Sequence, residues 1–350
     1  MFLRRIFWII IILMATLISS SMAQDDSSLR NLAERNGIYI GAAVYTNHLD
    51  TPEHAEVLSR EFNMLTPENE AKACQLQRSR GQFTFQLLDE LVAFAEQNDM
   101  VLRGHTLLWH QCELRWMENN DSYTREEAIA EMRDHIYTVV GRYRGRIAMW
   151  DVINEAFDDA ARRDTVWQRL IGDDYIELAF QFARDADPDA LLFYNDYGAE
   201  QVNAKSDAIY EMAADFVARG IPIDGIGLQS HFTVGGIAFS SISNNIQRLG
   251  ELGLQVHLTE ADIRFGGEPS DAILERQAGD YRDLMEVCLN HESCTAFIVW
   301  GVTDRLTWLR NTNLGFFSNP DVAPLLFDDE YQPKPAYYAL RDVLTGVDGG

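Results

Sequence analysis

Apolar runs with strand character alternate with amphipathic helical stretches about eight times along this chain. Such alternation predicts a parallel sheet covered by helices, and eight repeats in one domain favour an α/β fold of the eight-fold parallel β/α (TIM) barrel type. The alternative is a doubly wound open sheet, which usually has a glycine-rich phosphate-binding turn after its first strand. The segment Gly41-Ala42-Ala43 does not fit that motif, so we expect the closed barrel.

The expected strands share a short apolar run that ends at a polar segment: Tyr39–Tyr45, Asn63–Pro67, Val101–Trp109, Ile147–Asn154, Ala190–Asn195, Gly225–His231, Gln255–Asp262 and Thr295–Thr303. The expected helices share an apolar period of three to four residues: Phe85–Asn98, Arg125–Arg142, Tyr175–Asp185, Ala204–Ala218, Ile242–Leu252, Asp271–Asn290 and Ala336–Leu344.

Residues 1–23 have the features of a secretory signal peptide. Arg4 and Arg5 precede the apolar run Ile6–Ile18, and Ser21-Met22-Ala23 offers a cleavage site with small residues. The run is short for a membrane span. We therefore expect a mature protein of residues 24–350, a single catalytic barrel domain secreted to the extracellular space or the periplasm. An uncleaved membrane anchor is the rival interpretation.

The chain carries 29 basic and 54 acidic residues, a formal net charge of −25. This acidity disfavours binding to nucleic acid or to anionic membrane surfaces, because phosphate groups would be repelled. A neutral polymer is compatible with it. We expect a monomer with no nucleic-acid partner and no membrane contact after cleavage of the signal.

Four cysteines in an exported chain suggest disulfides. Cys288 and Cys294 flank a short turn between a helical run and a strand, which predicts a local bridge. Cys74 and Cys112 each follow a strand whose end we assign to the active site, and the sequence leaves open whether they form a second bridge.

Two glutamates stand at the ends of predicted strands, Glu155 in WDVINEAF and Glu260 in VHLTEADI. The active site of a β/α barrel lies at the carboxyl ends of its strands, so these residues are expected to meet there. A pair of carboxyl groups on separate strands is what hydrolysis of a glycosidic bond requires. Other strand ends supply polar and aromatic side chains suited to sugar hydroxyls and sugar faces: Glu68, Asn69, Lys72, His105, Trp109, Asn154, Asn195, Asp196, Tyr197, Gln229, His231, Asp262, Trp300 and Trp308.

Strand parity adds a constraint, because residues two apart share a face of a strand. It groups Gln229 with His231, Glu260 with Asp262, and His105 with Trp109. Asn154 and Glu155 are adjacent, so they can both face the site only if a bulge or the end of the strand redirects one of them.

The sequence gives no reason to expect a metal or a cofactor. His105 and His110 are five residues apart on one strand and should face opposite ways, and no HExxH helix is present.

The segments that carry this chemistry together resemble glycoside hydrolase family 10, the endo-β-1,4-xylanase family. They are LTPENEAK (65–72), RGHTLLWH (103–110), WDVINEAF (150–157), NDY (195–197), IDGIGLQSHF (223–232), VHLTEADI (256–263), WGVTDRLTW (300–308) and PLLFDDEYQPKPAYYAL (324–340). The resemblance runs in order from about Leu32 to Leu344.

The resemblance implies a retaining double displacement on xylan or xylo-oligosaccharides. Glu260 would be the nucleophile and Glu155 the general acid and base, with the two carboxyl groups about 5–5.5 Å apart. An anionic Glu260 beside Glu155 makes ionisation of the second carboxyl more costly, which suits the acid role.

The resemblance also implies roles for neighbouring residues. Asn154 would bond the sugar 2-hydroxyl, and His231, oriented by Asp262, would keep Glu260 ionised. Tyr197 would pack on the leaving-side sugar. Sugars on the non-reducing side would contact Glu68, Asn69, Lys72, His105, Trp109, Gln229, Trp300 and Trp308.

Departures from the family pattern fall beside the site, at Ala73, Cys112-Glu113-Leu114, Gly198 and Ala261. They leave room for another β-1,4-glycan or an aryl glycoside as the preferred substrate. A non-catalytic barrel that only binds glycan or protein is the alternative from a different class, although such barrels typically lose a catalytic carboxylate and this chain keeps both.

Overall fold

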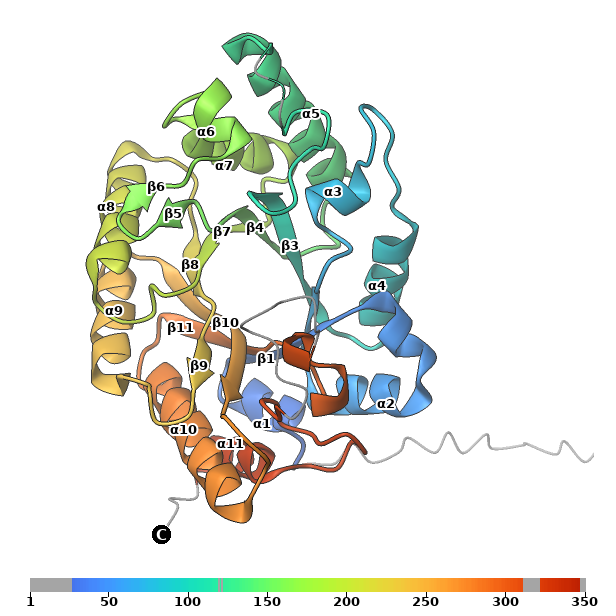
Figure 1. Cartoon of the computed structure of the whole chain (residues 1–350), viewed down its shortest axis with the longest axis vertical. Coiled ribbons are helices and arrows are strands. Elements are labelled where there is room, and N and C mark those ends of the chain that lie inside the picture. The colour runs from blue at the N-terminus through green and yellow to red at the C-terminus, as the bar shows by residue number, and fades with distance from the viewer. Residues whose placement is uncertain (1–26, 119, 121, 311–321, 347–350) are drawn as a thin grey trace, which may run out of the picture.

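Eight parallel strands close into a barrel (Figure 1). The computed structural model describes residues 27–118, 120, 122–310 and 322–346, so the expected signal peptide lies outside the described residues. The strands are β1 (Tyr39–Val44), β2 (Met64–Pro67), β3 (Val101–Trp109), β4 (Met149–Asn154), β7 (Leu191–Asp196), β8 (Gly225–Leu228), β10 (Gln255–Arg264) and β11 (Cys294–Val299). Because β11 pairs with both β1 and β10, the sheet closes and the open-sheet alternative is excluded.

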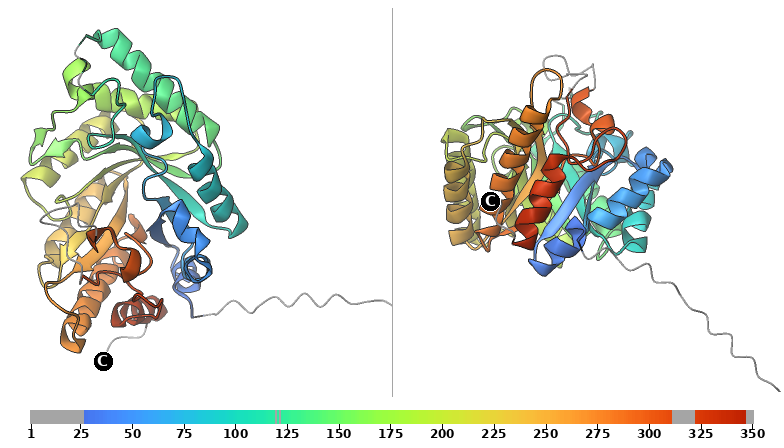
Figure 2. Two further views of the ribbon diagram at one scale, coloured as in Figure 1. Left: turned by 45° about the vertical axis from the view of Figure 1, so that its right-hand side comes forward. Right: turned by 90° about the horizontal axis from the view of Figure 1, so that it is seen from below.

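Helices surround the barrel on its outside (Figures 1 and 2). They are α1 (Leu29–Arg35), α2 (Pro52–Glu61), α3 (Ala73–Leu76), α4 (Gln86–Gln97), α5 (Arg125–Arg142), α6 (Val166–Leu170), α7 (Tyr175–Ala186), α8 (Ala204–Arg219), α9 (Phe239–Glu251), α10 (Asp271–Leu289) and α11 (Pro335–Thr345). The described residues also form short 3-10 turns, η1 (Thr46–Asp50), η2 (Asp304–Leu306) and η3 (Trp308–Arg310). Among the described residues, no helix is both long and apolar enough to span a membrane.

Local sequence explains where these helices begin and which face they bury. Thr124 caps α5 and forms a capping box with Glu127, which satisfies free N–H groups of the first turn. The buried face of α5 includes Met132, Ile136 and Val139, at the three- and four-residue spacing of one helical face. The first and last described helices lie side by side (Figure 2), where Asn36 Nδ2 donates to the carbonyl of Leu344 at 2.8 Å.

The barrel interior holds a small apolar cluster of Met64, Met149, Phe193, Ala296 and Ile298, separate from the larger core under the helices. Side chains therefore fill the barrel, as is usual for eight strands. The site is built on top of this packed interior.

Most expected strand bounds agree with the structure to within two residues, but two expected strands differ more. The expected strand Gly225–His231 is broken: β8 ends at Leu228, Ser230 adopts a left-handed backbone with φ of 69°, and His231 begins a separate short strand, β9 (His231–Thr233), which pairs with β10. The expected strand Thr295–Thr303 ends earlier, at Val299. The prediction of a regular strand from Gln229 to His231 was therefore wrong.

Two other small features lie outside the barrel sheet. The loop after β4 contains a two-stranded antiparallel hairpin of β5 (Phe157–Asp158) and β6 (Ala161–Arg162). Both cysteine pairs are bridged, Cys288 with Cys294 and Cys74 with Cys112. The second bridge, which the sequence left open, joins the segments after β2 and β3.

Candidate active site

Glu155 and Glu260 are joined by a chain of buried hydrogen bonds at the carboxyl ends of the strands. Asn195 Nδ2 donates to Glu260 Oε1 and to Asn154 Oδ1, both at 2.8 Å. Asn154 Nδ2 donates in turn to Glu155 Oε1 at 3.1 Å. Both glutamates are buried, with exposed fractions of 6% and 4%.

Asn195 links the two glutamates, whereas the sequence predicted it only as one of the polar residues at the strand ends. Its Oδ1 accepts the hydroxyl of Thr259 at 2.7 Å, which fixes the direction of its amide. The neighbouring strand makes room for it with Gly227, where a Cβ atom would lie 2.2 Å from Asn195 Oδ1. Glycine is therefore required at this point of close approach.

Glu155 follows the last residue of β4 and has a left-handed backbone, with φ of 59°. This conformation is uncommon for a residue with a side chain. It turns the chain so that Asn154 and Glu155 both face the site, and thus confirms that the end of the strand redirects one of them.

Three hydrogen bonds hold the backbone at Glu155. Its N–H donates to the carbonyl of Asn195 at 2.9 Å, and its carbonyl accepts Arg163 Nε at 3.0 Å. The next N–H, of Ala156, donates to the hydroxyl of Tyr194 at 3.0 Å. These three hydrogen bonds form a backbone clamp, which stabilises a conformation that would be unfavourable on its own.

The Glu155 carboxyl group accepts three N–H donors. Gln229 Nε2 donates to Oε1 at 2.9 Å, beside the bond from Asn154, and Trp109 Nε1 donates to Oε2 at 2.9 Å. His110 Nδ1 lies 3.7 Å from Oε2, too far for a hydrogen bond. Burial lowers the pKa of His110, which favours a neutral ring beside the carboxyl.

The Glu260 carboxyl group is surrounded by groups that favour its ionised form. His231 Nε2 lies 3.1 Å from Glu260 Oε2, and His231 Nδ1 lies 3.0 Å from Asp262 Oδ1. Burial alone would lower the pKa of His231, but the two carboxylates raise it well above its ordinary value. Burial raises the pKa of Glu260, but His231, His105 and Asn195 outweigh that effect and lower it overall.

Aromatic rings enclose this side of the site. Trp308 Nε1 donates to Asp262 Oδ2 at 2.7 Å, and its ring packs against His231 with centroids 5.2 Å apart. Trp300 meets His105 edge to face at 5.2 Å. These rings pack against the two histidines and offer apolar faces to a ligand.

His105 is held from below by a buried ion pair that the sequence did not assign. Its Nδ1 lies 2.9 Å from Asp151 Oδ2, and Asp151 also pairs with Arg103, which is fully buried in the barrel. A charged residue inside an apolar strand requires a partner, and the arginine in RGHTLLWH was the available signal.

The loop after β2 brings a second group of predicted residues to the site. Lys72 Nζ donates to Asn69 Oδ1 at 2.9 Å and lies 4.5 Å from the centre of the Trp109 ring. Burial lowers the pKa of Lys72 and raises that of Glu68. The Cys74–Cys112 bridge ties this loop to the segment that follows Trp109.

Tyr197 lies apart from the other predicted residues, with 41% of its surface exposed. Lys205 Nζ lies 3.9 Å from the centre of its ring and 2.7 Å from Asp196 Oδ1. The Tyr197 hydroxyl accepts a hydrogen bond from Arg163 Nη2 at 3.2 Å, and Arg163 also donates to the carbonyl of Glu155. Tyr197 is thus tied to Glu155 through the backbone clamp rather than through the carboxyl network.

The structure brings the predicted residues around Glu155 and Glu260 together, and Tyr197 is linked to them through Arg163. Across the described part of the chain, no set of three or more histidine, cysteine, aspartate or glutamate side chains is arranged to hold a metal ion. The arrangement offers a buried carboxylate, a second carboxyl ringed by N–H donors, and amides, hydroxyls and indoles around both. Such a site suits acid/base and nucleophilic chemistry on a sugar.

Known proteins similar to this chain include enzymes that act on sugar polymers. The sequence model of Glycosyl hydrolase family 10 matches residues 28–343. Endo-1,4-beta-xylanase B of Thermotoga neapolitana is 41% identical over 330 residues, covering 93% of this chain and 94% of that relative. Exoglucanase XynX of Acetivibrio thermocellus is 37% identical over 322 residues, but the chain spans only 29% of that relative's length. The crystal structure of xylanase 10B from Thermotoga petrophila RKU-1 in complex with xylobiose has 41% identity and a TM-score of 0.86, covering 91% of this chain and 97% of that one.

Proposed function

Because this chain belongs to glycosyl hydrolase family 10, we propose that it is a secreted retaining endo-1,4-β-xylanase that cleaves internal β-1,4 bonds of xylan by double displacement. The observation that carries the proposal is the buried network Glu155–Asn154–Asn195–Glu260, in a chain 41% identical to an endo-xylanase over nearly its whole length.

Glu260 is the proposed nucleophile. Its carboxylate attacks the anomeric carbon of the sugar on the non-reducing side of the bond, and the bond to the leaving oxygen breaks as the glycosyl-enzyme ester forms. The lowered pKa of Glu260, with His231 and Asn195 as its hydrogen-bond partners, supports an ionised nucleophile.

Glu155 is the proposed acid and base. It gives its proton to the leaving oxygen in the first step, and then takes a proton from the water that attacks the glycosyl-enzyme. Three N–H donors occupy its two oxygens, and a carboxyl group has about four acceptor positions, so one remains for the transferred proton. Gln229 and Trp109 support this role by fixing the direction of the carboxyl.

The remaining predicted residues are proposed to hold sugars. Asn154 is proposed to bond the 2-hydroxyl beside the scissile bond. Lys72 and Asn69 are proposed to serve the non-reducing side together with Glu68, His105, Trp300 and Trp308. Tyr197 is proposed to serve the leaving side. The proposed ligand is xylan or a xylo-oligosaccharide. The protein is proposed to act as a monomer.

Hydrolysis of arabinoxylan by the mature protein tests the proposal. It should release short xylo-oligosaccharides, and proton NMR of the first products should show β-anomers, since two inversions retain configuration. Initial α-anomers would contradict the retaining mechanism, and absence of cleavage would contradict the function.

A second candidate is preference for another β-1,4-glycan. The relative named an exoglucanase motivates it, as do the departures at Ala73 and Cys112 beside Lys72. Rates on xylan, mixed-linkage glucan and carboxymethyl cellulose distinguish the two candidates, and the xylanase proposal requires xylan to be the substrate that is hydrolysed fastest.

The two disulfides support the proposal that the protein is exported. N-terminal sequencing of exported protein should begin at Gln24; retention of residues 1–23 would favour the anchor.

A further inference from the structure

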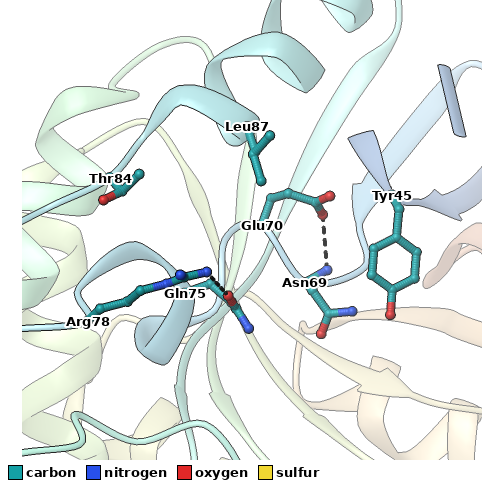
Figure 3. A pocket seen from close by; sticks show the side chains of 7 residues that line it. All are labelled: Tyr45, Asn69, Glu70, Gln75, Arg78, Thr84 and Leu87. Atoms are coloured by element: carbon teal, nitrogen blue, oxygen red, sulfur yellow. Dashed lines mark hydrogen bonds between the residues drawn. The ribbon is translucent and has the colours of Figure 1, made fainter. Parts of the chain in front are cut away.

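A pocket of about 410 Å³ lies beside the loop that follows β2 (Figure 3). Its lining comes from the segments after β1 and β2 and from the start of α4: Tyr45, Asn69, Glu70, Gln75, Arg78, Thr84 and Leu87. Asn69 also belongs to the proposed sugar-binding set and accepts the hydrogen bond from Lys72. The pocket therefore adjoins the proposed sugar-binding residues Asn69 and Lys72, and a substituent that extends past Asn69 would enter it.

The acidic residue of this lining is already engaged by the protein. Glu70 Oε1 accepts the N–H and the hydroxyl of Thr46 at 2.7 and 3.0 Å, and Oε2 accepts the N–H of Asn69 at 3.2 Å. Burial and the nearby Glu68 raise the pKa of Tyr45, so its phenol stays neutral. Neutral hydrogen-bonding groups and one apolar side chain, Leu87, make up most of the remaining surface.

Arg78 is the cation of the pocket. Its Nη2 donates to the neutral Gln75 Oε1 at 3.1 Å, and Figure 3 shows the guanidinium extending toward Gln75 across the pocket. Among the residues that the structure describes, no carboxylate pairs with it, whereas Arg80, two residues later, pairs with Glu131. A guanidinium with a neutral partner keeps donors free for two-point binding of a carboxylate.

The net negative charge of the chain makes a cation at Arg78 significant for ligand binding. At a net charge of −25 the protein repels anions in general, so an acidic ligand needs a local cation. Arg78 supplies one in a pocket whose neutral polar groups suit sugar hydroxyls.

We propose that this pocket binds a uronic-acid substituent carried on the xylan chain, with Arg78 pairing with its carboxylate; the proposal rests on the xylanase function given above. The substituted sugar lies beyond the one that contacts Asn69, on the non-reducing side of the cleaved bond. The pocket thereby favours acidic xylans over neutral ones.

Paired substrates test this assignment. One is a uronic-acid-substituted xylan, and the other is the same polymer after its carboxyl groups have been reduced to primary alcohols. Initial rates at low substrate give kcat/KM for the wild-type protein, for Arg78→Gln, and for Arg80→Gln, which removes the same charge from a neighbouring arginine that has a carboxylate partner.

Arg78→Gln should lower kcat/KM about two- to fivefold on the acidic polymer, the size of an exposed ion pair, and leave the reduced polymer unchanged. The wild-type preference should shrink in salt, because the pair is exposed. Arg80→Gln should change neither rate. An equal loss on both polymers, or no loss on either, would overturn the proposal. Failure of the xylanase function itself would look different, since the wild-type protein would then hydrolyse neither polymer.

Discussion

Glu155 and Glu260 meet in one hydrogen-bond network, but the protein controls them in different ways. Glu260 lies inside β10, beside a register shift against β11 between Leu258 and Ala261, and its side chain faces His231 and Asn195. Glu155 lies just past β4 on a left-handed backbone. The charge of Glu260 is therefore set by side-chain neighbours, whereas the position of Glu155 depends on bonds to its backbone.

The comparison teaches that the two carboxyl groups should fail differently when their surroundings change. Changes around Glu260 should alter its protonation, and hence the pH dependence of the reaction. Changes around Glu155 should alter geometry, and hence kcat at every pH.

The largest expected effect comes from Glu260→Ala, which should abolish essentially all turnover of xylan because no nucleophile remains. Azide should restore cleavage of an activated aryl xylobioside and yield the α-azide, since a single displacement from the opposite face inverts configuration. NMR of the product checks this. Retained xylan hydrolysis, or a β-azide product, would remove Glu260 from the proposed role.

Glu155→Ala is the matched change on the other carboxyl. It should lower kcat on xylan about 10²- to 10⁴-fold, the usual worth of general acid/base catalysis. A dinitrophenyl xylobioside, whose leaving group needs no proton, should still form the glycosyl-enzyme rapidly, and azide should then give the β-product. Equal losses on both substrates would show that Glu155 is not the proton donor.

His231→Asn tests the control of charge at Glu260. Loss of a charged partner should lower kcat/KM about 10- to 100-fold. It should also raise the pKa of Glu260, so the acid limb of the pH profile should move to higher pH, because a less stabilised carboxylate needs higher pH to ionise. A profile that falls uniformly without moving would mean that His231 acts only through packing. His291→Gln, at a ring bonded to Ser243 far along the chain, is the control.

Tyr194→Phe tests the backbone clamp at Glu155 and should have the smallest effect. It removes the hydroxyl that accepts the N–H of Ala156 and donates to the carboxyl of Asp196. We expect kcat to fall about tenfold with KM nearly unchanged, because a neutral hydrogen bond and a bond to a carboxyl group are both lost. The acid limb should not move.

Tyr143→Phe serves as the control for that change, because it removes a tyrosine–aspartate bond, to Asp89, outside the site. It should lower thermal stability without changing kcat. If both variants lower stability alike and neither changes kcat, the clamp is structural only.

The barrel and most of its element bounds could be predicted from periodicity and capping signals. The helix Arg125–Arg142 and the strand Val101–Trp109 match their expected ranges. The break between β8 and β9 could not be predicted, because the left-handed backbone at Ser230 has no local sequence signal such as glycine.

The strand ends and the family motifs led to the site residues that the structure brings together, but the supporting contacts were missed. Asn195 and Tyr194 form hydrogen bonds with residues more than thirty positions away, and Lys205 contacts the ring of Tyr197 from the start of α8. Such contacts depend on register between strands, which periodicity does not specify. One usable signal was parity, since Tyr194 and Asp196 are two apart and do bond each other.

The central claim is that Glu260 forms the covalent intermediate while Glu155 handles protons. A 2-deoxy-2-fluoro-xylobioside with a dinitrophenyl leaving group slows both steps but forms the intermediate faster than it is hydrolysed, so the glycosyl-enzyme should accumulate. One equivalent of dinitrophenolate should be released as the adduct forms. Mass spectrometry of a digest should then find one sugar adduct, on the peptide that contains Glu260. An adduct on the peptide that contains Glu155, or release of dinitrophenolate with no adduct, would contradict the account.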